Sequence, residues 1–419
     1  MTSQQKPHVV ILGGGFGGMR AARGLRHAPV RVTLIDRANH HVFQPLLYQV
    51  ATAALAPSDI ASPIRWMLRK QRNATVLLDE VRGVDADRHI VRLDGGRQIS
   101  YDYLVVATGA RHSYFGHGEW EEIAPGLKSL EDALEIRRRF LLAFELAEKS
   151  QDAEEQRALQ TFVLVGGGPT GVELAGVMPS IAHDAMRRDF RRIDTQNTRV
   201  VLLEGGPRVL PSFPESLSRR AHKDLEDLGV EVRTNALVTR VESDAVWMGD
   251  ERIATRTVFW AAGNAASPIG QSLGSHHDRA GRVQVSPDLS VPERPNVFVI
   301  GDLAIVTQDG KPVPAVAPAA MQMGDAAAKN IRRDLRDEPR VSFRYRNKGD
   351  LATIGRHKAI ADFGKFHVTG RLALWFWLFV HIMYLVGFRN RLSVLLQWAY
   401  AYVTYQRGVR LIMHASRLC

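Results

Sequence analysis

Residues 8–36 read HVVILGGGFGGMRAARGLRHAPVRVTLID and decide the fold. An apolar run, residues 8–12, leads into a glycine-rich turn. A stretch with helical apolar spacing follows, and a second apolar run ends at Asp36. This order predicts a strand, a tight turn, a helix and a second strand. The G-x-G-x-x-G pattern falls on Gly13, Gly15 and Gly18. Such glycines allow the turn, the approach of a pyrophosphate and close helix packing, so the stretch predicts a dinucleotide-binding domain with Asp36 on a ribose.

The same order returns at residues 161–173, TFVLVGGGPTGVE, whose strand partner, residues 199–203, ends in Glu204. Apolar strands that end in small residues also occur twice, at residues 101–109 and 258–263. The second set of pattern glycines is Gly166, Gly168 and Gly171. Gly13 precedes Gly109 by 96 residues and Gly166 precedes Gly263 by 97, so the chain is predicted to hold two similar dinucleotide-binding domains. Glu204 follows Gly171 by 33 residues rather than the usual twenty or so, and the charged excess near 184–197 is expected to extend the helix or its loop.

Composition restricts the class of protein. The 419 residues suffice for two or three domains, and the one cysteine, Cys419, allows neither a disulfide framework nor a cysteine-based metal site. The N-terminal residues, MTSQQKPH, lack the apolar core of a signal peptide, so a reducing compartment is expected. No metal site is predicted. The net charge of +11 is uneven, because seven basic and no acidic residues follow Asp362.

A third apolar strand, residues 296–300, precedes Gly301 and Asp302, and residues 314–331 read as a helix entered through prolines. The predicted fold class is therefore α/β, with two Rossmann-like domains, the second inserted in the first, and a C-terminal membrane-associating helical region. The expected divisions are residues 1–120 and 290–340 for the first domain, 160–265 for the second, and 341–419 for the C-terminal region.

Other elements are expected between these landmarks. Residues 57–72 read as a helix, residues 75–93 alternate as strands do, and residues 131–150 form an amphipathic helix before a polar linker. The loop at residues 40–48 follows the ribose-binding acid and should run near the cofactor, although its aromatic residues also suit a simple buried connection.

The C-terminal region suggests a membrane surface. Residues 372–388, LALWFWLFVHIMYLVGF, are flanked by Arg371 and Arg389, and a second apolar stretch covers residues 392–405. A spanning helix needs about twenty apolar residues, so helices that lie in one leaflet are favoured over a single span or hairpin. A homodimer interface is the remaining alternative. Nucleic acid is not an expected partner, because the basic residues alternate with long apolar runs.

Together these motifs resemble the flavoproteins with two dinucleotide-binding domains, such as glutathione-reductase-like enzymes. The resemblance implies FAD in the first site and a nicotinamide nucleotide in the second. The residues implied at FAD are Gly13, Gly15, Phe16, Gly17, Gly18, Asp36, Arg37, Gln44, Ala107, Thr108, Gly109, Gly301 and Asp302. Those implied at the nucleotide are Gly166, Gly168, Gly171 and Glu204, with Gly263 as a further cofactor-binding residue. A carboxylate at Glu204 favours NADH over NADPH, although Arg208 lies close in sequence.

Four stretches sharpen the resemblance: residues 45–65, 165–176, 314–331 and 351–365. They are similar to those of bacterial type II, non-pumping NADH:quinone oxidoreductases. This family implies hydride transfer from NADH to FAD, electron transfer to a membrane quinone, and attachment at the cytoplasmic face of the inner membrane. Disulfide reductases and sulfide:quinone reductases use redox cysteines near the flavin, and this sequence has none to offer there.

The resemblance implies three catalytic residues for proton delivery or quinone binding: Glu173, Gln322 and Lys365. Each also has a plainer structural interpretation: Glu173 as a carboxylate in the first turn of a helix, Gln322 as a residue that ties down a helix, and Lys365 as a solvated charge. His381 in the apolar tail is expected to be a packed imidazole. The alternative functions are a soluble NADH oxidase or ferredoxin reductase, and a nucleotide-sensing flavoprotein that docks a partner.

Overall fold

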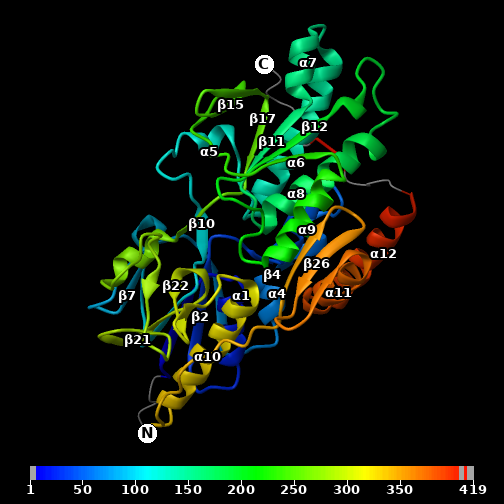
Figure 1. The fold of residues 1–419 in the computed structure, drawn as a ribbon. Coiled ribbons are helices and arrows are strands. Elements are labelled where there is room, and N and C mark those ends of the chain that lie inside the picture. The colour runs from blue at the N-terminus through cyan, green and yellow to red at the C-terminus, as the bar shows by residue number, and fades with distance from the viewer. Residues whose placement is uncertain (1–5, 405–409, 413–419) are drawn as a thin grey trace. The chain divides into compact units, whose positions relative to one another are not determined.

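The computed structural model describes residues 6–404 and 410–412 and divides into two compact units (Figure 1). The first unit comprises Met1–His41, Ser62–Arg111 and Asn264–Lys348. The second unit comprises Val42–Ala61, His112–Gly263 and Gly349–Cys419. Each unit contains one of the two parallel sheets predicted from the repeated glycine pattern.

The first unit is built on a six-stranded sheet with strand order β20-β21-β9-β1-β2-β5. The strands are β1 (His8–Leu12), β2 (Arg31–Asp36), β5 (Ala74–Leu78), β9 (Tyr103–Val106), β20 (Ser290–Val291) and β21 (Arg294–Val299). Only the edge strand β20 is antiparallel to its neighbour. The sheet takes strands from both sides of the second sheet's segment, so the predicted insertion of one domain in the other is confirmed.

Two helices of the first unit pack with almost no space between their backbones. Helix α1 (Phe16–Gly24) lies against α10 (Ala317–Asp334), which has a proline in its first turn as expected. A Cβ atom on Gly324 would lie 2.3 Å from the backbone oxygen of Gly17, so this approach requires glycine. The close contact holds the N-terminal turn of α1 in a fixed position beneath the glycine loop.

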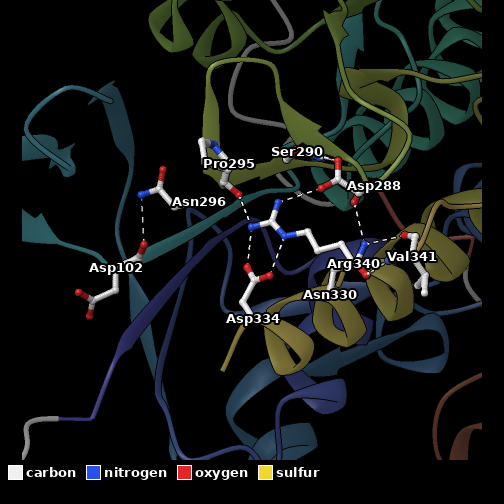
Figure 2. Close-up of polar contacts among 9 residues, drawn as sticks. All are labelled: Asp102, Asp288, Ser290, Pro295, Asn296, Asn330, Asp334, Arg340 and Val341. Atoms are coloured by element: carbon white, nitrogen blue, oxygen red, sulfur yellow. Dashed lines mark hydrogen bonds and ion pairs between the residues drawn. The ribbon is translucent and has the colours of Figure 1, made fainter. Parts of the chain in front are cut away.

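A partly buried arginine, Arg340, joins the segment after α10 to the rest of the first unit (Figure 2). The guanidinium of Arg340 donates to Asp334 and Asp288 and to the backbone oxygen of Pro295, and it lies 4.8 Å from the ring of Phe298. Both carboxylates raise the pKa of Arg340. The Asn330 amide also bridges to the same segment through the backbone of Asp288 and Val341. Residues after α10 are thus tied to the β20–β21 edge of the sheet.

The second unit is built on a parallel sheet with order β13-β12-β11-β17. Its strands are β11 (Thr161–Val165), β12 (Arg199–Leu203), β13 (Val230–Arg233) and β17 (Thr257–Trp260). The helices of this part are α6 (Leu130–Lys149), α7 (Ala153–Leu159), α8 (Pro169–Ser180) and α9 (Glu215–Glu226). Ser129 and Asp132 form a capping box at α6, which explains where that helix begins.

A three-stranded antiparallel sheet, which the sequence did not predict, joins the tail to this unit. Its strands are β25 (Asp350–Ile354), β26 (Lys358–Asp362) and β27 (His367–Thr369). Gly355 follows β25 with φ +65°, and a Cβ atom on Gly176 of α8 would lie 2.6 Å from its nitrogen. The Lys358 ammonium adds ion pairs of 2.7 and 3.1 Å to Asp224 and Asp227.

The tail forms two helices, α11 (Gly370–Tyr384) and α12 (Phe388–Thr404) (Figure 1). The first apolar stretch is thus helical as far as Tyr384, and the second is helical as far as Thr404, where the described part of the helix ends. Within residues 6–404 and 410–412, no helix combines the length and the apolar character that crossing a bilayer requires.

Two local expectations were wrong or incomplete. Residues 57–72 form α3 (Pro57–Ile60), β4 (Ala61–Pro63) and α4 (Ile64–Leu68) rather than one helix, because Pro63 cannot continue the pattern of α3. The charged excess after α8 forms a short π-helical turn (Ile181–Ala185) and a 3₁₀ turn (Thr195–Asn197).

The remaining elements are short. Two antiparallel sheets comprise β6 (Val81–Asp85), β7 (Ile90–Leu93) and β8 (Gln98–Ser100), and β14 (Arg240–Val241), β15 (Ala245–Met248) and β16 (Glu251–Ala254). The others are β3 (His40–Val42), α2 (Leu47–Ala51), β10 (Ala110–His112), α5 (Trp120–Ile123), β18 (Asn264–Ala266), β19 (Val283–Gln284), β22 (Ala304–Ile305), β23 (Thr307–Gln308) and β24 (Lys311–Pro312).

Candidate functional site

The first glycine turn leaves an open cradle between β1 and α1. Gly13 has φ +100°, and a Cβ atom there would lie 2.4 Å from the oxygen of Ala107. A Cβ on Gly18 would lie 1.9 Å from the oxygen of Gly13, whereas one on Gly15 would meet nothing within 4 Å. Gly13 and Gly18 are therefore required by the protein's own packing, while Gly15 faces open space where a phosphate can approach the backbone.

The acid at the end of β2 is held by the same turn. One carboxylate oxygen of Asp36 accepts from the nitrogen of Gly14 at 2.5 Å, and the other accepts from the nitrogen of Ala38 at 2.7 Å. Carboxylate oxygens have further lone pairs, so Asp36 retains acceptor capacity for a ribose hydroxyl. Arg37 is exposed beside it.

Other residues expected at FAD lie at strand ends of the same sheet. Ala107, Thr108 and Gly109 follow β9, and the Thr108 hydroxyl is buried without a hydrogen-bond partner among the described residues. Gly301 and Asp302 follow β21, where Gly301 has φ +72°. Phe16 and Gly17 begin α1. An orphaned hydroxyl and an open glycine cradle at adjacent strand ends fit the dinucleotide part of FAD.

The second glycine turn repeats this construction closely. Gly166 has φ +109°, a Cβ on Gly171 would lie 1.9 Å from the oxygen of Gly166, and one on Gly168 would meet nothing within 4 Å. The two carboxylate oxygens of Glu204 accept from the nitrogens of Gly167 and Gly206, at 2.6 and 2.7 Å. This arrangement suits a second dinucleotide.

Arg208 raised doubt about the choice between NADH and NADPH. Its guanidinium donates to the oxygen of Pro211 at 2.9 Å, which directs it along its own loop. Glu204 is therefore the charge that the structure places directly at the end of β12. A carboxylate there accepts from a free 2′-hydroxyl and repels a 2′-phosphate.

Glu173, in the first turns of α8, lines a cavity of about 130 Å³. The other lining residues are Gln44, Leu47, Tyr48, Leu127, Lys128 and Thr170. Burial raises the pKa of Glu173 to about 8, and a hydrogen bond with the backbone of Thr353 acts in the opposite direction. The carboxyl is therefore mostly protonated at neutral pH and can donate a proton.

A chain of hydrogen bonds runs from this cavity to the tail. The Tyr48 hydroxyl pairs with the Thr353 hydroxyl at 3.0 Å and accepts from the amide of Gln49 at 3.0 Å. The Gln49 oxygen accepts from the indole nitrogen of Trp398, on α12, at 2.7 Å. Residues from α2, β25 and α12 thus support Glu173, and sequence reasoning missed this network because its members are far apart in the chain.

The other predicted catalytic residues are not among the residues that line this cavity. Both amide atoms of Gln322, on α10 in the first unit, bond to the backbone of Arg346 at 3.0 and 2.9 Å, as a residue that ties down a helix would. Lys365 is exposed in the turn between β26 and β27 and is not among the described residues that line the cavity. His381 stacks on Trp377 with ring centroids 3.8 Å apart, and burial lowers its pKa to about 4. It is thus the packed imidazole that was expected.

Two similar nucleotide cradles on parallel sheets define a pyridine nucleotide flavoprotein. Comparison with known proteins agrees: residues 7–324 match the pyridine nucleotide-disulphide oxidoreductase family, and residues 347–405 match the NDH2 C-terminal domain. The chain is 43% identical to the type II NADH:quinone oxidoreductase Ndh of Mycobacterium tuberculosis, over 97% of this chain and 92% of that protein. It is 45% identical to NdhA of the same organism, over 96% and 88%.

A solved structure shares the fold as well. NDH2 from Plasmodium falciparum in complex with NADH superposes with a TM-score of 0.88 at 21% identity, covering 98% of this chain and all of that one. The chain therefore belongs to the type II NADH:quinone oxidoreductases, a family of FAD-dependent oxidoreductases. The predicted family and fold class are confirmed.

Proposed function

We propose that this protein oxidises NADH and passes two electrons through FAD to a membrane quinone without pumping protons. The observation that carries the proposal is the pair of matching cradles, each with an open glycine and an acid held by the turn. Family membership at 43–45% identity supports it. The same chain therefore carries one cradle that suits FAD, at the first glycine turn, and one that suits the electron donor NADH, at the second.

FAD, when bound, supplies a two-electron acceptor that can hand electrons on to a quinone. On the protein's side, Gly13, Gly15, Gly18 and Asp36 would hold its ADP half, with Thr108 and Asp302 nearby along the strand ends. Gly166, Gly168, Gly171 and Glu204 would bind NADH. We also propose FAD contacts for the other residues that the sequence implied there, which are Phe16, Gly17, Arg37, Gln44, Ala107, Gly109 and Gly301.

A quinone that takes up two electrons also takes up two protons, one on each oxygen, to become a quinol, so the protein must deliver protons to it. Glu173 is proposed as the proton donor, because its raised pKa keeps it protonated at neutral pH within a cavity. Tyr48 and Thr353 position it. For Gln322 and Lys365 we propose secondary roles in proton delivery or quinone binding. Substitution of each residue tests this role by its effect on quinone reduction.

The tail is proposed to lie in one leaflet of the bilayer. Side chains spaced three or four residues apart form exposed apolar stripes on α11 and α12. They are Leu372, Trp375, Phe376, Phe379, Met383, Phe388, Leu392, Leu395, Leu396 and Tyr400. Arg371 and Arg389 are exposed at the helix ends, where they suit lipid headgroups, whereas Arg391 caps α11 through the oxygens of Leu385 and Met383.

We further propose residues 1–120 and 290–340 as the FAD-binding domain, residues 160–265 as the NADH-binding domain and residues 341–419 as the membrane-anchor region. The proposed location is the cytoplasmic face of the bacterial inner membrane. NADH added to inverted membrane vesicles should be oxidised, whereas NADH outside intact spheroplasts should not. Activity in both preparations would refute the location.

The test of the activity is NADH oxidation by the purified yellow protein without oxygen, with and without a short-chain quinone. Strong acceleration by the quinone is expected. An equal rate of NADH oxidation with and without the quinone would refute the proposal and favour a soluble oxidase or a nucleotide-sensing protein.

The test of the membrane role is flotation of the protein with vesicles of anionic and of neutral lipid. Binding to vesicles is expected, more strongly to anionic lipid. If the protein is instead a soluble homodimer without detergent and does not float with vesicles, the apolar stripes pair two copies of the chain.

A further inference from the structure

An aromatic loop, residues 113–119, covers the end of β17 in the second unit. The Trp260 indole nitrogen, at the last position of β17, donates to the oxygen of Ser113 at 2.9 Å. Three residues further on, a Cβ atom on Gly263 would lie 2.7 Å from the tip of the Phe115 ring. The Phe115 ring thus lies directly on Gly263, three residues beyond the end of this strand.

Residues on both sides of Phe115 anchor the loop. Tyr114 is buried, its hydroxyl donates to the oxygen of Ala124 at 2.9 Å, and its ring lies 5.2 Å from that of Trp260. The His117 ring stacks on Trp120 with centroids 4.1 Å apart. The anchors hold the loop in one conformation, so the position of Phe115 is determined by its neighbours.

Phe115 itself is held in an unfavourable state. Its φ is +52°, a left-handed conformation that costs energy for a bulky residue, and 67% of its surface is exposed. One side of the ring meets Trp260, with ring centroids 6.4 Å apart, but most of the ring remains exposed. Backbone strain combined with an exposed aromatic ring indicates that the ring has a use other than stability.

The position of the ring relative to the glycine turn suggests that use. In the sheet, β11 lies between β12 and β17, and Glu204 at the end of β12 takes the adenosine ribose in the proposed function. A dinucleotide crosses the ends of the central strands at the glycine turn, so its other half extends toward β17. A Cβ on Gly166 would lie 2.6 Å from the nitrogen of Ala262, which makes the turn and the end of β17 continuous.

We infer that Phe115 forms one wall of the site for the nicotinamide riboside half of NADH. The ring stands one residue beyond Ala262, on the side of the turn opposite Glu204, and offers an exposed aromatic surface to a flat, apolar heterocycle or its ribose. This inference rests on the proposed function, because it requires NADH in the second cradle. It adds a substrate-binding residue outside both glycine patterns.

The test compares Phe115→Ala and Phe115→Tyr with the wild type, in binding of NAD⁺ and of ADP-ribose, which lacks the nicotinamide. An aromatic contact contributes enough to predict that Phe115→Ala weakens NAD⁺ binding about three- to ten-fold and leaves ADP-ribose binding unchanged. Phe115→Tyr should retain wild-type affinity for both. Trp66→Ala, another exposed aromatic residue but in the first unit, is the matched control and should change neither.

Three outcomes would overturn the inference. Unchanged NAD⁺ affinity in Phe115→Ala would show that the ring does not touch the nicotinamide half. Equal loss of NAD⁺ and ADP-ribose binding would assign the ring to the adenosine half or to folding, and a lowered thermal midpoint would identify the latter. Wild-type protein that binds NAD⁺ and reduces quinone keeps the proposed function intact in each of these cases, whereas wild-type protein that binds no NAD⁺ refutes both.

Discussion

Replacing Glu173 by Gln removes a titrating group while keeping its size, and its effect on quinone reduction can be calculated from the structure. With a pKa of about 8, about nine-tenths of Glu173 is protonated at pH 7 and about one-tenth at pH 9. If the protonated form supplies a quinol proton, the wild-type kcat should fall about ten-fold over this range. Glu173→Gln should lower kcat at pH 7 by about 10²-fold, the usual contribution of a general acid, and should abolish the pH dependence.

The assay measures NADH oxidation without oxygen at pH 6 to 10, with a short-chain quinone and, separately, with ferricyanide. Ferricyanide accepts electrons without protons, so its reduction should be unaffected by Glu173→Gln. Glu215→Gln, an exposed carboxylate on α9 of the same unit, is the control and should behave as wild type. A flat wild-type profile between pH 7 and 9, with full quinone activity in Glu173→Gln, would refute the role of Glu173.

The same residue makes a prediction about stability. The pKa of Glu173 is higher in the folded protein, about 8, than its ordinary value of 4.5, so the folded state binds this proton more tightly than the unfolded state. Its contribution to the free energy of unfolding is therefore present below pH 4.5 and declines as the pH rises toward 8. Denaturant titrations should show that Glu173→Gln loses this decline, and an identical pH dependence in both proteins would contradict the raised pKa.

Three further perturbations test other parts of the structure. Glu204→Ala leaves the nitrogens of Gly167 and Gly206 without an acceptor and should lower the NADH preference, measured as the ratio of kcat/KM for NADH and NADPH, about ten-fold; an unchanged ratio would place the ribose elsewhere. Serine at both Trp375 and Phe379, exposed on α11, should reduce vesicle flotation more than ten-fold, because each ring contributes about 2 kcal/mol on burial; undiminished flotation would exclude α11 as the contact. Arg340→Met should lower the free energy of unfolding in urea by about 3 kcal/mol, whereas Arg344→Met, whose ion pair is exposed, should cost less than about 1 kcal/mol; equal effects would contradict the importance of the partly buried ion pairs of Arg340.

Much of the fold could be predicted because its determinants are local. The residues of each glycine turn, from Gly13 to Gly18 and from Gly166 to Gly171, are adjacent in sequence, and the last glycine of each turn is required by a contact within its own strand–turn–helix unit. The acids that end β2 and β12 follow the same rule. Local patterns of this kind report backbone geometry directly, so the two sheets and the insertion were predictable.

The rest depends on contacts between distant segments. The hydrogen bond from Trp398 to Gln49 joins residues that are 349 positions apart, and the apolar periodicity of neither helix predicts it. The β25–β27 sheet was not predicted, although Gly349, Gly355, Gly364 and Gly370 precede, separate and follow its three strands. The π-helical turn after α8 replaced a regular helix end. The positive φ of Phe115 is likewise visible only in three dimensions, since phenylalanine gives no sign of a left-handed backbone.

The approach of Gly176 to Gly355 has a consequence for how such a protein can change over time. A Cβ on Gly355 would lie 2.8 Å from the oxygen of Gly176, so neither residue can gain a side chain without parting α8 from the end of β25. Thr353, two residues before Gly355, would move away from Glu173 as well. The C-terminal region therefore cannot be exchanged as an independent cassette: a chimera that takes this region from another protein must also take the matching α8, or lose the hydrogen bond between Glu173 and the backbone of Thr353.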